Sequence, residues 1–238
     1  MRLILTFKTE HKKITNQYRS FLMSYFKAAY EKEYVEDFKD SYDGSNDPHP
    51  FSFAVYIKDL AHEDDNIITP LNEIKMVISS NDYTLINLLY NSLLLNRKKK
   101  MSIKPNNKIW LERLSLRHLE EIDKEEVKIK MLSPLLIRVR DASQNKDYYK
   151  TIEDEGYVND LNFNLKFQSN LFKLNQENLE IIPLKTKKVV VPLMKVRYDA
   201  TIGTFLLKGS KETINTLYKI GIGSRRSEGF GLFEIVKC

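Results

Sequence analysis

The first half of the chain alternates between two hydrophobic periods, and this alternation is what most constrains its fold. Two segments place apolar residues at helical spacing, one segment, 51–58, alternates as a half-buried strand does, and three others read as strands. The segment 41–50 is dense in turn formers, which predicts a loop. The expected elements are a strand at 2–8, a helix at 14–38, strands at 51–58 and 72–79, a helix from a cap at Ser80 or Asn81 to about Asn96, and a strand at 108–116.

This βαββαβ order is that of a ferredoxin-like unit. A second set of elements starts near residue 126, and a serine at 210 predicts the cap of a short helix. Two domains of sheet plus helices, 1–125 and 126–238, fit this pattern better than one domain does. The expected elements of the second set are strands at 127–131, 134–140, 179–184, 189–199 and 202–209, helices at 159–173 and 211–220, and a last strand at 232–237.

Positive charge is concentrated in the last quarter of the chain. The net charge is +6, and residues 182–238 hold 11 Lys or Arg against 4 Asp or Glu. Residues 1–181 hold 27 basic and 28 acidic side chains, so the whole excess lies near the C-terminus. This asymmetry indicates a surface that binds a polyanion, although a basic end on an otherwise ordinary protein would look the same.

Composition excludes several other classes. Hydrophobic residues make up 42% of the chain, which suits a packed core. There is no apolar run near the ~18–20 residues that span a bilayer, and the first residues lack the features of a signal peptide. Cys238 is the only cysteine, so no disulfide can form within the chain. These features predict a cytoplasmic protein.

Four of the eight glycines fall within the eleven residues 221–231, GIGSRRSEGFG. Glycine lets a backbone approach a ligand closely, and exposed amides of such a loop can hold phosphate oxygens. Arg225 and Arg226 lie between the two glycine pairs, where guanidinium groups could bind phosphate with two hydrogen bonds. A simple turn between a helix and a strand needs one or two glycines rather than four.

This loop resembles the C-terminal signature of the RAMP superfamily of CRISPR systems. The signature is glycine, hydrophobic, glycine, about five residues including a basic one, and then glycine, hydrophobic, glycine. Further stretches are similar to the repeat-processing endoribonucleases of that superfamily. They are YRSFLMSYFKAA (18–29), HPFSFAVYI (49–57) and MLSPLLIRVRD (131–141).

The resemblance implies an α+β fold of tandem ferredoxin-like domains with the C-terminal glycine-rich loop. It also implies metal-independent cleavage of precursor CRISPR RNA within its repeats, leaving 2′,3′-cyclic phosphate and 5′-hydroxyl ends. The partner would be CRISPR repeat RNA, both as precursor and as guide, while further subunits of an interference complex and a homodimer stay open. The implied RNA-binding residues are Gly221, Gly223, Ser224, Arg225, Arg226, Gly229 and Gly231.

The reaction needs a general base, a general acid and stabilisation of a charged transition state. Of the four histidines, His49 lies in the loop after the first helix, where these enzymes usually carry their catalytic histidine. Many relatives place it earlier, near Tyr42, and His49 stands closer to a position often held by lysine. Tyr25 matches a helix position where relatives can carry a catalytic tyrosine, and packing on the apolar stripe explains it equally well. Tyr42 and Lys39 are weaker candidates.

Two alternatives remain open. A RAMP subunit that coats guide RNA without cutting it would share the same loop, whereas an unrelated ferredoxin-like RNA-binding protein would need aromatic platform motifs that the strands lack. The sequence holds no cluster with metal-ligand spacing, so neither a metal nor a cofactor is expected. The basic run at 97–100 is explained either by a solvated helix end or by contact with phosphate.

Overall fold

The computed structural model describes residues 1–33, 50–141 and 143–236. They form two compact units. Unit 1 contains most of the residues up to Leu119, and unit 2 contains most of those from Glu120 onward. The sequence places this boundary a few residues later, at 125.

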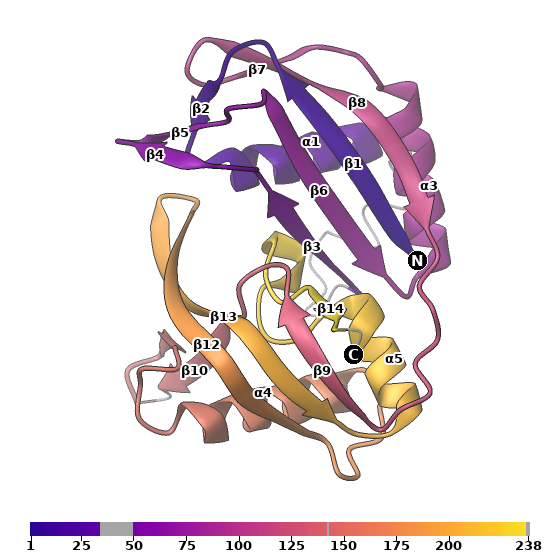
Figure 1. Ribbon diagram of the computed structural model, residues 1–238, viewed down its shortest axis with the longest axis vertical. Coiled ribbons are helices and arrows are strands. Elements are labelled where there is room, and N and C mark those ends of the chain that lie inside the picture. Colours follow the sequence, from indigo (N-terminus) through magenta and orange to yellow (C-terminus); the bar gives the residue numbers. More distant parts are fainter. Residues whose placement is uncertain (34–49, 142, 237–238) are drawn as a thin grey trace. The chain divides into compact units, whose positions relative to one another are not determined.

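Unit 1 is built on a sheet with the strand order β3-β6-β1-β8-β7. The central strand β1 pairs antiparallel with both β6 and β8, and its Leu3, Leu5 and Phe7 are buried. Helix α3 lies against β1, β6 and β8 and contacts α1, and Figure 1 shows both helices on the same face of the sheet. The elements are β1 (Arg2–Thr9), α1 (Tyr18–Glu33), β3 (Phe51–Tyr56), β6 (Glu73–Ser80), α3 (Tyr83–Leu95), β7 (Met101–Ile103) and β8 (Asn107–Arg117).

The chain order β1-α1-β3-β6-α3-β8 is the predicted βαββαβ unit. The sequence missed β7 and a small second sheet with the order β2-β5-β4, whose strands are β2 (Lys13–Thr15), β4 (Ala61–Glu63) and β5 (Asn66–Ile68). Each of these strands is three residues long, which is too short to show an alternating pattern.

Two boundaries in unit 1 differ from expectation. The first helix begins at Tyr18, not at residue 14, because Ile14 pairs with Ile67 across β2 and β5 and both side chains are fully buried there. Ile14 fits a helical stripe by its spacing alone. Helix α3 is capped by Asp82, whose carboxylate accepts the amide of Leu85 at 3.0 Å, and not by Ser80 or Asn81. Ser80 instead donates its hydroxyl to the carbonyl of Pro50.

Unit 2 contains a sheet with the order β12-β13-β9-β14 and a separate hairpin of β10 and β11. Helix α5 confirms the predicted segment, and the Ser210 hydroxyl accepts the amide of Thr213 at 3.2 Å as its cap. The elements are β9 (Glu126–Met131), β10 (Ile137–Asp141), β11 (Lys146–Lys150), α4 (Tyr157–Leu171), β12 (Glu180–Leu193), β13 (Val196–Lys208), α5 (Lys211–Ile220), the short 3₁₀ helix η1 (Arg226–Glu228) and β14 (Phe233–Ile235).

The predicted single strand at 189–199 is wrong. Met194 and Lys195 both have positive φ, 49° and 65°, and form the turn between β12 and β13. A tight hairpin needs two such residues, and these two lack the asparagine or glycine that usually signals the turn. Among the described residues, no helix is both long and apolar enough to cross a membrane.

Candidate functional site

The loop 221–231 joins α5 to β14 inside unit 2, and its two glycine pairs lie against each other. The amide of Ile222 donates to the carbonyl of Gly231 at 2.9 Å. Gly231 has a φ of 72°, and a Cβ built on it would lie 1.8 Å from the carbonyl oxygen of Ile222. Gly221 ends α5 with a φ of 78°. The repeated glycines therefore allow two backbone segments to touch.

Most loop amides are used within the protein. The amide of Gly223 donates to the side-chain oxygen of Gln168 at 2.9 Å, and the side-chain nitrogen of Gln168 donates to the carbonyl of Gly221 at 2.8 Å. The amides of Ser224 and Gly231 donate to the carbonyls of Leu136 and Pro134. These amides donate to groups within the protein, and the role of the glycine loop in binding phosphate stays a prediction.

The segment with Ser133 and Pro134 is the other half of this arrangement. The hydroxyl of Ser133 accepts the amide of Leu232 at 2.9 Å, and the amide of Ser133 donates back to the carbonyl of Leu232. Ser133 is 1% exposed. Two stretches that the sequence singled out separately are thus hydrogen-bonded partners.

Arg225 is the loop arginine that reaches solvent, and its side chain is 35% exposed. Its guanidinium donates to the hydroxyl of Tyr149 at 3.0 Å and to both carboxylate oxygens of Glu228 at 2.9 and 2.8 Å. It also lies over the rings of Tyr149 and Tyr198. Burial opposes its charge, but the hydrogen bonds with Tyr149 and Glu228 outweigh that effect and raise the pKa of Arg225.

Arg226 points into the unit and is only 8% exposed. It donates to the carbonyl of Gly223 at 3.0 Å, and its guanidinium lies 5.2 Å from the ring centre of Phe172. Burial lowers the pKa of Arg226 to about 10, so it still carries its charge at neutral pH. In this conformation it holds the loop rather than offering a surface to a ligand.

Few of the residues that hold the loop could be identified from sequence patterns. Gln168 is 4% exposed and lies on the buried side of α4, after Leu161 and Leu165. A polar side chain on a buried stripe is the one signal that could have found it. Tyr149 carries no signal of its own, because tyrosine is common on strands.

Ser224 extends the exposed side of the loop toward α4. Its hydroxyl donates to the side-chain oxygen of Asn164 at 3.4 Å, and the side-chain nitrogen of Asn164 donates to the carbonyl of Arg138. Ser224, Arg225, Ser227 and Glu228 are the loop residues with partial exposure.

Tyr25 is the one catalytic candidate among the described residues. It is 3% exposed in the core of unit 1, with edge contacts to Phe7 and Phe26. Burial raises the pKa of its hydroxyl to about 12. Within the described part of the chain, this hydroxyl has no hydrogen-bond partner. The other three candidates, Lys39, Tyr42 and His49, lie outside the described residues.

Comparison with known proteins shows the family. Residues 117–235, which are half of the chain, match the family model described as CRISPR associated protein Cas6, C-terminal. The chain therefore belongs to the Cas6 family. Members of this family are repeat-processing endoribonucleases. No curated protein matches this sequence.

Solved structures show the fold. A Cas6-related protein from Pyrococcus furiosus is 18% identical with a TM-score of 0.82, and the match covers 100% of this chain and 98% of that one. A structure described as an RAMP protein binding different RNA substrates is 15% identical with a TM-score of 0.82 over 100% of both chains. A Cas6 product complex is 14% identical with a TM-score of 0.69 over 99% of both chains. The predicted α+β fold of tandem ferredoxin-like domains is confirmed.

Replacing Gly231 by alanine should strongly destabilise unit 2, because the new methyl group would meet the backbone of Ile222. Gly156→Ala is a matched control, since Gly156 has a φ of 73° but its Cβ would find nothing closer than 3.7 Å. The control should lose roughly 1–2 kcal/mol of unfolding free energy from the left-handed backbone. Gly231→Ala should lose roughly a further 1–3 kcal/mol from overpacking, measured by urea denaturation. Equal losses in both variants would contradict the close contact.

Proposed function

We propose that this chain is an endoribonuclease that cuts precursor CRISPR RNA within its repeats. The observation that carries this proposal is the match of residues 117–235 to the Cas6 family, over the part of the chain that contains the glycine loop. Two similar structures are described as a Cas6 product complex and as an RAMP protein binding different RNA substrates, which supports RNA as the ligand.

The proposed reaction uses the ribose 2′-hydroxyl of the substrate as nucleophile. A base removes its proton, the 2′-oxygen attacks the adjacent phosphorus in line, and an acid protonates the leaving 5′-oxygen. The products would be a 2′,3′-cyclic phosphate and a 5′-hydroxyl. Since the nucleophile comes from RNA, the protein has to orient the phosphate and move two protons, and these tasks do not require a divalent metal.

In this proposal the loop supplies one face of the RNA site. Arg225 is the natural phosphate contact, because its exposed guanidinium is fixed by Tyr149 and Glu228 and carries a permanent charge. Ser224 adds a hydroxyl donor beside it. The glycines and Arg226 act indirectly, by holding the backbone that presents these two side chains.

The proton-transfer groups are proposed from the segment 39–49. His49 is the leading candidate, with Lys39 and Tyr42 as alternatives. Tyr25 is packed among Phe7 and Phe26, and its pKa of about 12 keeps it protonated near neutral pH. It therefore serves better as a core residue than as a base.

A second candidate function is a subunit that binds guide RNA without cutting it. The burial of Tyr25 favours this alternative. Tyr25 is the one catalytic candidate among the described residues, and its buried hydroxyl is not accessible for proton transfer to RNA. Incubation of the chain with a CRISPR repeat RNA, followed by gel analysis, separates the two functions.

The two loop arginines should respond differently to replacement. Arg225→Ala should weaken binding of repeat RNA by roughly 1–3 kcal/mol and make its salt dependence shallower. Arg226→Ala should instead lower Tm, because it removes a buried hydrogen bond and the contact with Phe172. Filter binding at several salt concentrations and thermal melts measure the two effects. An Arg225→Ala variant with unchanged affinity and salt slope would remove the loop from the RNA site.

Cleavage should persist in excess EDTA, because the substrate supplies the nucleophile. An RNA with 2′-deoxyribose at the cut site should bind normally and stay whole. Gel assays of the two substrates with and without EDTA measure both results. If EDTA stopped cleavage and magnesium alone restored it, the proposed mechanism would be wrong.

His49→Ala should cut roughly 10²–10⁴-fold more slowly than wild type, the usual cost of losing a general acid or base. Repeat RNA should still bind about as well, and Tyr25→Phe is the control that removes a buried hydroxyl without changing the rate. Single-turnover rates at saturating enzyme separate the chemical step from affinity. A His49→Ala rate within about threefold of wild type would exclude this histidine from proton transfer and direct attention to Lys39 and Tyr42.

A further inference from the structure

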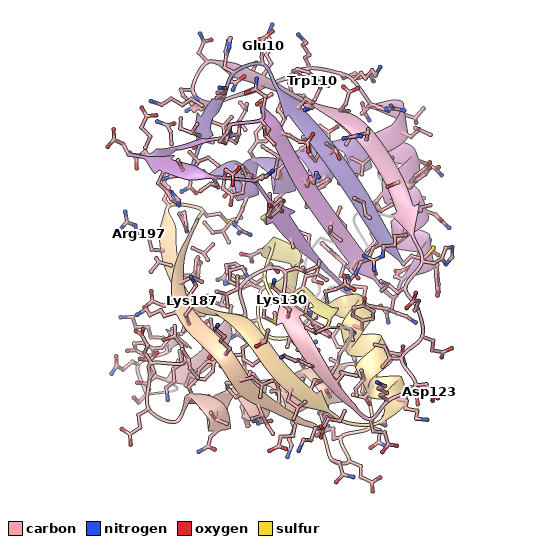
Figure 2. The ribbon with its side chains drawn as sticks, viewed as in Figure 1. Glu10, Trp110, Asp123, Lys130, Lys187 and Arg197 are labelled. Carbon is pink, nitrogen blue, oxygen red and sulfur yellow. The ribbon has the colours of Figure 1, made fainter. Side chains whose placement is uncertain are left out.

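Unit 1 contains a cavity of about 480 Å³ at the end of its main sheet, where β1 ends and β8 begins. The connection from β1 to β2 and the hairpin of β7 and β8 form its walls, and Figure 2 shows Glu10 and Trp110 at this end of the sheet. Its volume lies within the range of about 300–1,000 Å³ that is usual for small-ligand sites. It is larger than one phosphate group requires and can admit a nucleotide.

The floor of the cavity is held by the side chain of Asn107, which is 3% exposed. Its oxygen accepts the amides of His11 and Lys108 at 2.9 and 2.7 Å, and its nitrogen donates to the carbonyls of His11 and Lys13 at 2.7 and 2.9 Å. Three of these bonds join the β1–β2 connection to the start of β8 and fix the two walls relative to each other, and the fourth comes from the neighbouring residue Lys108. The lining side chains are therefore presented from a preorganised backbone.

The surroundings of the cavity are strongly basic. Residues 97–108 hold six Lys or Arg and no Asp or Glu. The acidic residue of the lining, Glu10, is bound by Lys100 at 3.2 Å, and Lys100 also lies over the ring of Trp110. The hydrogen bond from Lys100 lowers the pKa of Glu10, so this carboxylate stays ionised and offsets Lys100.

The lining also holds Lys104 and Lys108, and the charge of Lys108 contributes to the lowered pKa of Glu10. Among the residues that the structure describes, neither Lys104 nor Lys108 has an ion-pair partner, and both are exposed. Lys108 lies opposite Ser102 across the hairpin, so both side chains project from the same face of the β7–β8 pair. His11 adds an imidazole to the same lining. Ammonium and hydroxyl groups around a concave surface are the chemistry that binds phosphate.

We propose that this cavity of unit 1 is a phosphate-binding site that takes a nucleotide, and that it holds a backbone phosphate of the RNA substrate. This inference rests on the proposed function, because the RNA substrate would supply the phosphate. A nonspecific surface of solvated lysines would carry the same charge, but RNA affinity would then not depend on whether the lysines line the cavity.

The test compares two double variants of the full chain in binding a labelled CRISPR repeat RNA. The pocket variant carries Lys104→Gln and Lys108→Gln, and the control carries Lys58→Gln and Lys75→Gln, which remove the same charge from unit 1 outside the cavity. The pocket variant should lose roughly tenfold in affinity at 0.1 M salt, with a salt slope shallower by roughly 1. The control should stay within about twofold of wild type. Thermal melts check that both variants fold.

A second measurement distinguishes RNA from a free nucleotide as the source of the phosphate. Adenosine monophosphate and inorganic phosphate are titrated into each protein and followed by NMR, with signals of His11 and Ser102 as reporters. Shifts in wild type that are lost in the pocket variant support phosphate binding. If these shifts occur while RNA affinity is unchanged in the pocket variant, the site takes free nucleotides and its assignment to RNA is wrong.

The other possible results of these two measurements distinguish a failure of the cavity proposal from a failure of the proposed function. Equal RNA affinities for the pocket and control variants, with no shifts from either small ligand, would overturn the cavity as a phosphate site while leaving cleavage intact. Equal losses in both variants would show a general charge effect and overturn it as well. If wild type neither binds nor cuts repeat RNA, the proposed function fails, and the NMR titration alone decides the cavity.

Discussion

The backbone contact between Ile222 and Gly231 is the interaction on which the C-terminal site depends. It brings the two glycine pairs together, and the missing Cβ of Gly231 is what permits the approach. Once the ends of the loop are joined in this way, the five residues between them must form a compact projection that contains the 3₁₀ turn η1. The position of Arg225 on that projection follows from this closure.

The same closure explains why two adjacent arginines have different roles. The backbone of Arg225 is left-handed, with a φ of 52°, which turns successive side chains in different directions. Arg226 enters the interior beside Phe172, while Arg225 stays at the surface between Tyr149 and Glu228. Gln168 completes the arrangement from α4 by bonding to Gly221 and Gly223. The loop is therefore an internally bonded structure with a narrow exposed side.

Unit 1 uses another polar side chain in a similar way. Asn107 ties the β1–β2 connection to the start of β8 through three hydrogen bonds, as Gln168 ties α4 to the glycine loop. In both places a buried amide satisfies backbone groups that no strand partner reaches, which avoids the cost of leaving them unpaired. Both amides lie beneath a surface that presents basic residues.

Local patterns in the sequence determined the βαββαβ order of unit 1, the helix capped by Ser210 and the family signature of the loop, because these depend on residues near one another in the chain. Only the tertiary structure decided that Ile14 belongs to a strand, that the segment 189–199 is broken at Met194 and Lys195, and that the loop amides bond inward. Each of these features depends on contact partners that are distant in sequence or on backbone dihedral angles that the residue types do not predict. The different environments of Arg225 and Arg226 were likewise decided by the tertiary structure. The two side chains have the same chemistry, and only the direction in which the folded backbone points them makes one buried and the other partly exposed.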